Sequence, residues 1–176
     1  KPARSFLFRS GAFMSASDRV TITVKGVGGH AARPHHAIDP IVAAAGIVMA
    51  LQTVVARNVD PTQVALVTIG SIHGGKAMNV IAGEVTLGLS VRSFDAEVRA
   101  LLQNRITGLV RSQAASFGAS ADIDYQLGHP VLVNSERETE LARQVAEELV
   151  GAASVVARTE QITGSEDFAY MLEQRP

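Results

Sequence analysis

The chain has 176 residues, a hydrophobic fraction of 47% and a formal net charge of -1 at pH 7. The length allows one domain, or one domain and part of another, and the near-neutral charge gives no electrostatic reason to expect nucleic acid or an anionic membrane as partner. Cysteine is absent, which excludes disulfides, thiolate metal ligands and a cysteine nucleophile in this sequence. Because no apolar run reaches the length of a bilayer span and the first residues do not resemble a signal peptide, we expect a soluble, cytoplasmic protein.

The first predicted elements are a strand, a helix and a second strand. Residues 20–25 alternate apolar and polar side chains, as a half-buried strand does. Asp39 and Pro40 are typical of the N-cap and first residue of a helix, which we expect over residues 40–57. The near-continuous apolar run over residues 64–72 then indicates a strand covered on both faces.

The next three elements repeat this pattern. Residues 84–93 alternate, with one apolar face formed by Val85, Leu87, Leu89 and Val91. Asp95 can cap a second helix that ends at Gly118, with an apolar stripe of Val98, Leu102, Ile106, Leu109 and Phe117. Residues 121–127 alternate once more. The order strand, helix, strand, strand, helix, strand predicts an α+β fold of the ferredoxin-like βαββαβ type, a four-stranded antiparallel sheet with two helices on one face.

The tail has weaker signals. Ser135 and Glu138 have the spacing of a capping box before a helix whose apolar stripe is Leu141, Val145 and Leu149. Ser165 can cap a last helix. One strand and two helices are too few for an independent core, so we expect both ends of the chain to belong to a second, larger domain.

Chemistry-bearing residues first appear in the segment Gly26 to His36, directly after the first strand. Its glycine spacing and Pro34 argue against a phosphate-binding loop. A metal site stays open by residue type, although Pro34 breaks any helical spacing among the candidate ligands His30, His35 and His36. A glycine turn with surface histidines is the simpler interpretation.

Two further positions carry possible binding groups. Asn79 lies in the segment His73 to Ile81, a connection longer than a hairpin turn needs, and could bind a ligand or only support the loop backbone. Arg92 ends an alternating strand on its polar face. Its guanidinium could clamp a carboxylate or only form a surface ion pair with Glu84 or Asp95.

Four segments in order carry a family resemblance: Gly-Gly-His-Ala-Ala-Arg-Pro-His, Asn-Val-Ile, Val-Arg-Ser-Phe and Gly-Ser-Glu-Asp-Phe-Ala-Tyr-Met. They closely resemble the metal-dependent amidohydrolases that include hippurate hydrolase, N-acyl-amino-acid deacylases and auxin-conjugate hydrolases, within the aminoacylase and carboxypeptidase group of metallopeptidases. Ala82 departs from the proline that the family usually has there. The resemblance covers essentially the whole chain.

The resemblance implies an α/β domain that holds two divalent metal ions (zinc, manganese, cobalt or nickel) and an inserted ferredoxin-like lid that forms a homodimer. Residues 16–130 match the lid, while residues 1–15 and 131–176 match pieces of the catalytic domain. The family's metal ligands and general-base glutamate match nothing here. We therefore expect no metal site on this chain and no activity from it alone. The whole enzyme would hydrolyse N-acyl amino acids or small peptides.

The resemblance also assigns roles. His30 matches a histidine that stabilises the oxyanion in the partner subunit's active site, Asn79 a substrate-binding asparagine and Arg92 an arginine that contacts the substrate carboxylate. The alternative is a stand-alone ferredoxin-like regulatory dimer that binds a small molecule, since the core pattern fits it equally well. An RNA-binding module of this topology is disfavoured because aromatic residues make up 5% of the chain and no basic stripe is present.

The helix over residues 40–57 predicts self-association. One face carries Ile41, Ala44, Ala45, Val48, Leu51 and Val55, and the remaining positions hold no charge before Arg57. A helix that is apolar on all sides needs cover on two sides, and a single sheet covers only one. We therefore expect a symmetric contact through this helix and a neighbouring edge strand.

Overall fold

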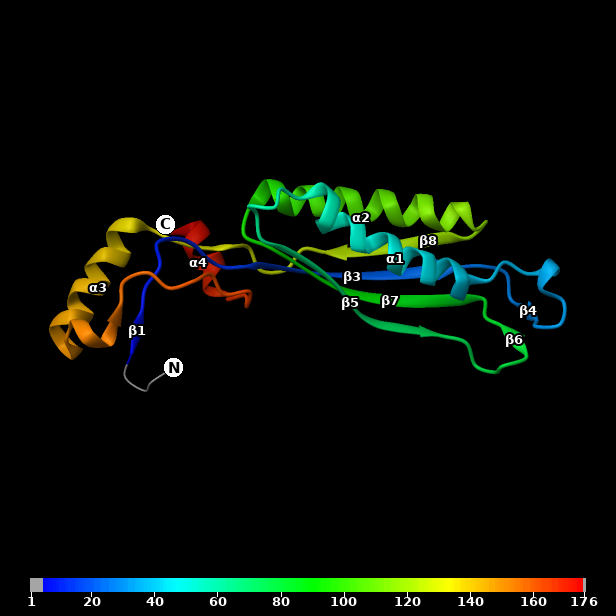
Figure 1. The fold of residues 1–176 in the computed structure, drawn as a ribbon, viewed down its shortest axis with the longest axis horizontal. Helices are drawn as coiled ribbons and strands as arrows, with labels where there is room; N and C mark the ends of the chain where they lie inside the picture. Colours follow the sequence, from blue (N-terminus) through cyan, green and yellow to red (C-terminus); the bar gives the residue numbers. More distant parts are fainter. Residues whose placement is uncertain (1–4, 176) are drawn as a thin grey trace. The chain divides into compact units, whose positions relative to one another are not determined.

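The structure is a computed structural model that describes residues 5–175 (Figure 1). These residues divide into two compact units. Unit 1 comprises residues 5–17, 93–96 and 129–175, and unit 2 comprises Asp18–Arg92 and Glu97–Gly128. The assignment of unit 1 to a catalytic domain stays a prediction.

Unit 2 is built on a four-stranded sheet with the order β5-β7-β3-β8. The strands are β3 (Ala16–Lys25), β5 (Ala65–Gly74), β7 (Glu84–Ser93) and β8 (Ser120–Gln126). β3 and β8 are antiparallel, from Arg19 opposite Gln126 to Lys25 opposite Ser120. The first and third strands of the motif occupy the centre, so the predicted ferredoxin-like fold is confirmed.

Two helices cover one face of this sheet: α1 (Pro40–Asn58) and α2 (Ala96–Ser116) (Figure 1). The Asp39 carboxylate accepts a hydrogen bond from the Ile41 amide at 2.9 Å, which confirms the predicted N-cap. The core between helices and sheet includes alternate residues of the strands, among them Val20, Ile22, Val24, Val85, Leu87, Leu89 and Val91. The alternation expected over residues 84–93 is therefore confirmed.

One expectation for unit 2 is wrong. β5 is an edge strand covered on one face only, and Leu66 and Ile72 are 42% and 53% exposed. A continuous apolar run does not distinguish a strand covered on both faces from an edge strand with an exposed apolar face. The buried face of α1 consists of Pro40, Ala43, Ala44, Ile47, Leu51 and Val54.

The expectation that no segment is apolar enough for a bilayer also needs correction. By length and composition α1 could cross a membrane, with a mean hydropathy of 1.7. In the structure one side of α1 packs into the core of unit 2. A core helix of a globular domain can have the same length and hydropathy. Packing against the core explains the apolar residues on the buried side of α1, but not those on its exposed side.

Unit 1 contains two short strand pairs and two helices. β1 (Phe6–Leu7) is parallel to β10 (Val155–Val156), and β2 (Gly11–Met14) is antiparallel to β9 (Leu132–Asn134). The helices are α3 (Glu136–Val150) and α4 (Phe168–Gln174), with the 3-10 turn η2 (Ala152–Ser154) between α3 and β10. The apolar stripe of α3 is exposed at Leu141, Val145 and Leu149.

The expected helix caps of unit 1 are wrong in detail. Ser135 occupies the N-cap of α3, but its side chain makes no capping hydrogen bond. The N-cap of α4 is Asp167 and not Ser165. The position of Ser135 at the N-cap is thus as predicted, whereas the start of α4 was misplaced because Ser and Asp near a helix start are interchangeable as sequence signals.

Candidate functional site

The segment after β3 is held in a closed loop. Val27 and Ile38 exchange two backbone hydrogen bonds of 2.8 and 3.0 Å, which joins the two ends of the loop. Gly26 is required at this closure, because a Cβ there would lie 2.1 Å from the Ile38 carbonyl oxygen. The 3-10 turn η1 (Pro34–His36) lies inside the loop.

This loop pairs with the connection between β5 and β7. β4 (Gly29–His30) is antiparallel to β6 (Val80–Ile81), with Gly29 opposite Ile81 and His30 opposite Val80. The Ala31 amide then donates to the Asn79 carbonyl at 3.0 Å. The two loops lie at the same end of the sheet (Figure 1). His30 and Asn79, named separately from the sequence, are thus brought together.

The tautomer of His30 follows from its hydrogen bond. The imidazole is exposed, and its Nδ1 accepts from the Ala32 amide at 3.1 Å. A ring nitrogen that accepts carries no proton, so the neutral ring carries its proton on Nε2. His30 therefore presents an N–H donor that an acceptor from outside the chain can reach.

The other histidines of the loop do not complete a metal site. The rings of His35 and His36 lie 4.1 Å apart and are exposed. Across residues 5–175, no group of three or more His, Asp or Glu side chains could hold a metal ion. The described residues therefore do not fit a two-metal centre, and we derive no chemical step through a metal on this chain.

A hollow of about 750 Å³ lies beside the paired loops. Its wall includes Lys25, His73, Lys76 and Glu84, together with backbone of the glycine-rich segments. Met78, at the tip of the loop next to Asn79, is fully exposed. The end of the sheet that carries His30 thus offers polar and apolar groups to a ligand.

Arg92 lies at the opposite end of the sheet. The Gly26 amide donates to the Gly83 carbonyl at 2.9 Å, so the start of β7 adjoins the His30 loop. A strand rises about 3.3 Å per residue, which carries Arg92 about 26 Å from Glu84. One copy of the chain therefore does not bring Arg92 together with His30 and Asn79.

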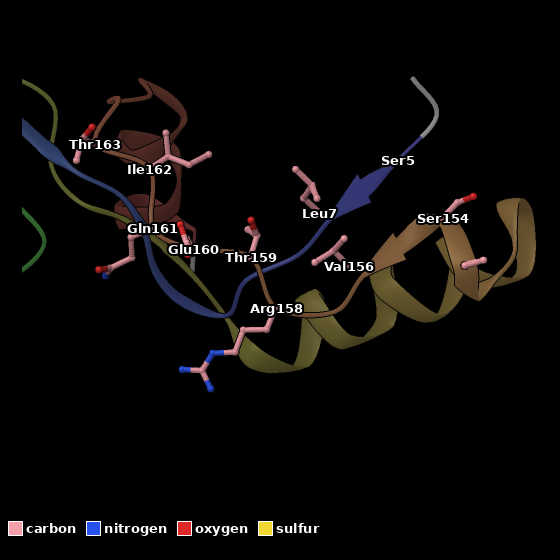
Figure 2. Close-up of a pocket in the computed structure, with 11 residues that line it drawn as sticks. Ser5, Leu7, Ser154, Val156, Arg158, Thr159, Glu160, Gln161, Ile162 and Thr163 are labelled. Atoms are coloured by element: carbon pink, nitrogen blue, oxygen red, sulfur yellow. The ribbon is translucent and has the colours of Figure 1, made fainter. Parts of the chain in front are cut away.

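A separate hollow of about 770 Å³ lies in unit 1 (Figure 2). Leu7 and Val156 of the paired strands β1 and β10 line it side by side, with residues 158–163 beyond them (Figure 2). No sequence-predicted site residue lies in this hollow. It offers no histidine and no pair of carboxylates, so the candidate site remains in unit 2.

Known proteins resemble this chain along most of its length. Residues 15–117 match the family described as the peptidase dimerisation domain. An N-acetyl-L-cysteine deacetylase of Bacillus subtilis is 40% identical over 96% of this chain and 40% of its own length. A hippurate hydrolase of Campylobacter jejuni is 36% identical over 98% of this chain and 45% of its own length. The chain thus spans less than half the length of these relatives.

Solved structures agree with these matches. A putative aminohydrolase from methicillin-resistant Staphylococcus aureus has a TM-score of 0.86 and 32% identity, covering 98% of this chain and 44% of its own. A Bacillus subtilis protein described as a dinuclear metal-binding peptidase of the M20 family has a TM-score of 0.77 and 27% identity, covering 99% and 42%.

Proposed function

Because the chain belongs to the family of the peptidase dimerisation domain, we propose that it is the lid and dimer-forming part of a metal-dependent amidohydrolase. The substrates are N-acyl amino acids or small peptides. Relatives named N-acetyl-L-cysteine deacetylase, hippurate hydrolase and N-acetyldiaminopimelate deacetylase support this class, since each name describes an acyl group on nitrogen.

The observation that carries the proposal is the hydrogen bond from the Ala32 amide to Nδ1 of His30, which leaves Nε2–H as the donor of the neutral ring. When a nucleophile attacks an amide carbonyl, negative charge develops on the carbonyl oxygen, and a preorganised N–H donor stabilises it. The Ala32 amide fixes the ring of His30, and the β4–β6 pair fixes its backbone. The donor therefore needs little reorganisation when the charge develops. Asn79 lies beside His30 because its carbonyl oxygen accepts a hydrogen bond from the Ala31 amide, and in this proposal it orients the substrate.

The position of Arg92 supports a site built from two copies of the chain. A small N-acyl amino acid cannot bridge about 26 Å. In our proposal His30 and Asn79 of one copy meet a substrate whose carboxylate binds Arg92 of the other copy. A guanidinium suits this role because it binds a carboxylate through two parallel hydrogen bonds.

The surface of unit 2 offers a contact for such a homodimer. The outer side of α1 exposes Ile41, Val42 and Met49, which are 43%, 52% and 71% exposed. The neighbouring edge strand β5 exposes Leu66 and Ile72 as well as its unpaired backbone. A two-fold contact through α1 and β5 would cover the exposed apolar side chains of α1 and the edge of β5.

The catalytic metals belong, in this proposal, to parts of the enzyme other than residues 5–175. The Bacillus neighbour is described as dinuclear, but no described group here could hold one metal ion. The exposed stripe of Leu141, Val145 and Leu149 on α3 and the two-stranded parallel sheet β1–β10 support a unit 1 that packs against further chain.

The test compares the 176-residue chain with a protein of the relatives' full length that contains it. Both are assayed with N-acetyl and N-benzoyl amino acids in the presence of zinc, manganese or cobalt. We expect turnover from the full-length protein only. Turnover by the chain alone, or its absence from a folded, metal-loaded full-length protein, would contradict the proposal, and the second result would favour a stand-alone regulatory dimer.

A further inference from the structure

Asp18 and Arg99 form an ion pair within unit 2 that the proposed reaction does not use. Their side chains are 2% and 18% exposed. Nε of Arg99 donates to both carboxylate oxygens of Asp18, at 3.2 and 3.1 Å, and its Nη2 donates to Oδ1. The planar guanidinium and the carboxylate thus fix each other's orientation.

The pair lies where the chain enters and leaves unit 2. Asp18 is the first residue of the unit, Gly128 is the last, and Arg99 follows the third crossing at Glu97. The Gly128 amide donates to Asp18 at 3.0 Å, and Nη2 of Arg99 donates to the Gly128 carbonyl at 3.0 Å. This ion pair and its hydrogen bonds therefore connect residues next to three of the points where the chain passes between unit 1 and unit 2.

Tyr125 completes the set. Its hydroxyl donates to Oδ2 of Asp18 at 3.4 Å. Burial, and then the charge of Asp18, raise the pKa of Tyr125 above its usual range, so the phenol stays protonated and can donate. The carboxylate of Asp18 thus receives donors from α2, from β8 and from the segment after β8.

Stability alone is a weak explanation for this arrangement. Removing two charges from water costs several kcal/mol per ion, and well-packed apolar residues are often equally stable in such positions. An exposed ion pair, between Lys25 and Asp122, joins β3 and β8 at the other end of their ladder, where the two side chains are 51% and 71% exposed. The buried pair lies beside the points where the chain enters and leaves unit 2, which favours a role in fixing the local arrangement of β3, α2 and the end of β8.

We propose that Asp18 and Arg99 are positioning residues: they lock the start of β3, the start of α2 and the end of β8 together, so that β3 carries the His30 loop at its other end in a fixed position within unit 2. The catalytic part of this inference rests on the proposed function. The structural part, a locked crossing, does not depend on it.

Amide hydrogen exchange of the 176-residue chain tests the lock. Asp18→Asn keeps the side-chain shape, and Arg99→Lys keeps the charge but loses the two-pronged contact. We expect the Gly128 amide to exchange about 10-fold to 100-fold faster in both, as for a lost hydrogen bond to a charged group. The ladder around Ile22 and Ile123 keeps its protection, and the matched control Asp122→Asn changes neither region.

Two results would overturn the lock. One is an unchanged Gly128 amide in both variants. The other is an equal acceleration throughout unit 2, including loss of the folded state in both variants, because the pair would then support overall stability only. If Asp18→Asn alone fails to fold, Arg99→Lys decides.

Kinetics of the full-length protein test the positioning role. Displacement of a catalytic group weakens the stabilisation of the transition state more than the binding of substrate. We therefore expect Asp18→Asn to lower kcat about tenfold or more while KM stays within about threefold. Asp122→Asn should leave both unchanged. An unaltered kcat for Asp18→Asn refutes the positioning role. An unmodified protein without amidase activity refutes the proposed function instead, and the exchange result still decides the lock.

Discussion

His30 lies opposite Val80 in the antiparallel pair of β4 and β6, which joins two loops about fifty residues apart in sequence. The next backbone hydrogen bond, from Ala31 to Asn79, places the two candidate substrate-binding residues side by side. Together with Gly26, which closes the His30 loop, this pairing fixes the backbone around both residues.

The role of His30 predicts a specific kinetic effect. In the full-length protein His30→Ala should lower kcat by about 10²–10³ with little change in KM, because an oxyanion donor acts in the transition state. His35→Ala, in the same exposed loop, is the matched control and should stay close to the unmodified enzyme. Steady-state kinetics with an N-acyl amino acid measure both, and a kcat of His30→Ala within a few-fold of the control would exclude the role.

The exposed side of α1 predicts a dimer. Size exclusion with light scattering should give a dimeric mass for the 176-residue chain and a monomeric mass for Met49→Glu, because the new carboxylate would lose its water in the interface. Ser112→Glu adds the same charge on the exposed side of α2 and should remain dimeric. A monomeric unmodified chain, or a dimer that survives Met49→Glu, would rule out this contact.

The closure of the His30 loop predicts opposite effects of two glycine substitutions. Gly26→Ala should lower the free energy of unfolding by about 2 kcal/mol, because its Cβ would overlap the Ile38 carbonyl. Gly108→Ala, inside α2 with nothing within 4 Å of the added Cβ, should raise it by about 1 kcal/mol. Urea unfolding measures both. A stable Gly26→Ala would show that the loop closes differently.

The ion pair on α3 predicts an unusual titration. A hydrogen bond from Arg143, at 2.8 Å from its Nε, lowers the pKa of Glu140 from 4.5 to about 2. The folded state favours the carboxylate. Its stabilising contribution is therefore complete above about pH 4.5 and is lost as the pH falls through about 2.

Carboxyl chemical shifts measured against pH test this. Arg143→Gln should return the pKa of Glu140 toward 4.5. Arg137→Gln should not, because Arg137 pairs with Glu138 at 3.9 Å. A Glu140 that still titrates near 2 without Arg143 would show that another group holds the carboxylate.

Local signals predicted the main elements of unit 2. The alternation in residues 84–93 gave β7 with its observed bounds, and Asp39 with Pro40 placed the start of α1. These two predictions succeeded because burial alternates with the two-residue period of a strand, and because a capping side chain bonds to an amide only two residues away. The buried face of α1 cannot be predicted from the sequence, because apolar side chains surround the helix and its composition does not define one inward side.

Contacts between distant segments could not be predicted in this way. β4 and β6 have two residues each, too few for any periodic pattern, and Arg99 reaches Asp18 across 81 positions. The site residues His30, Asn79 and Arg92 were named individually, without their grouping. The topology did contain one usable signal: in an antiparallel pair the end of β3 adjoins the start of β7, which places His30 and Arg92 at opposite ends of the sheet.

Mixing two inactive full-length variants, His30→Ala and Arg92→Ala, tests whether the site is shared between two copies of the chain. If each site takes His30 from one copy and Arg92 from the other, a mixed dimer contains one intact site. Random exchange makes half of the dimers mixed, so activity should recover to about a quarter of the unmodified enzyme. If native mass spectrometry shows mixed dimers and no activity returns, His30 and Arg92 do not act across two copies, and the proposed shared site is wrong.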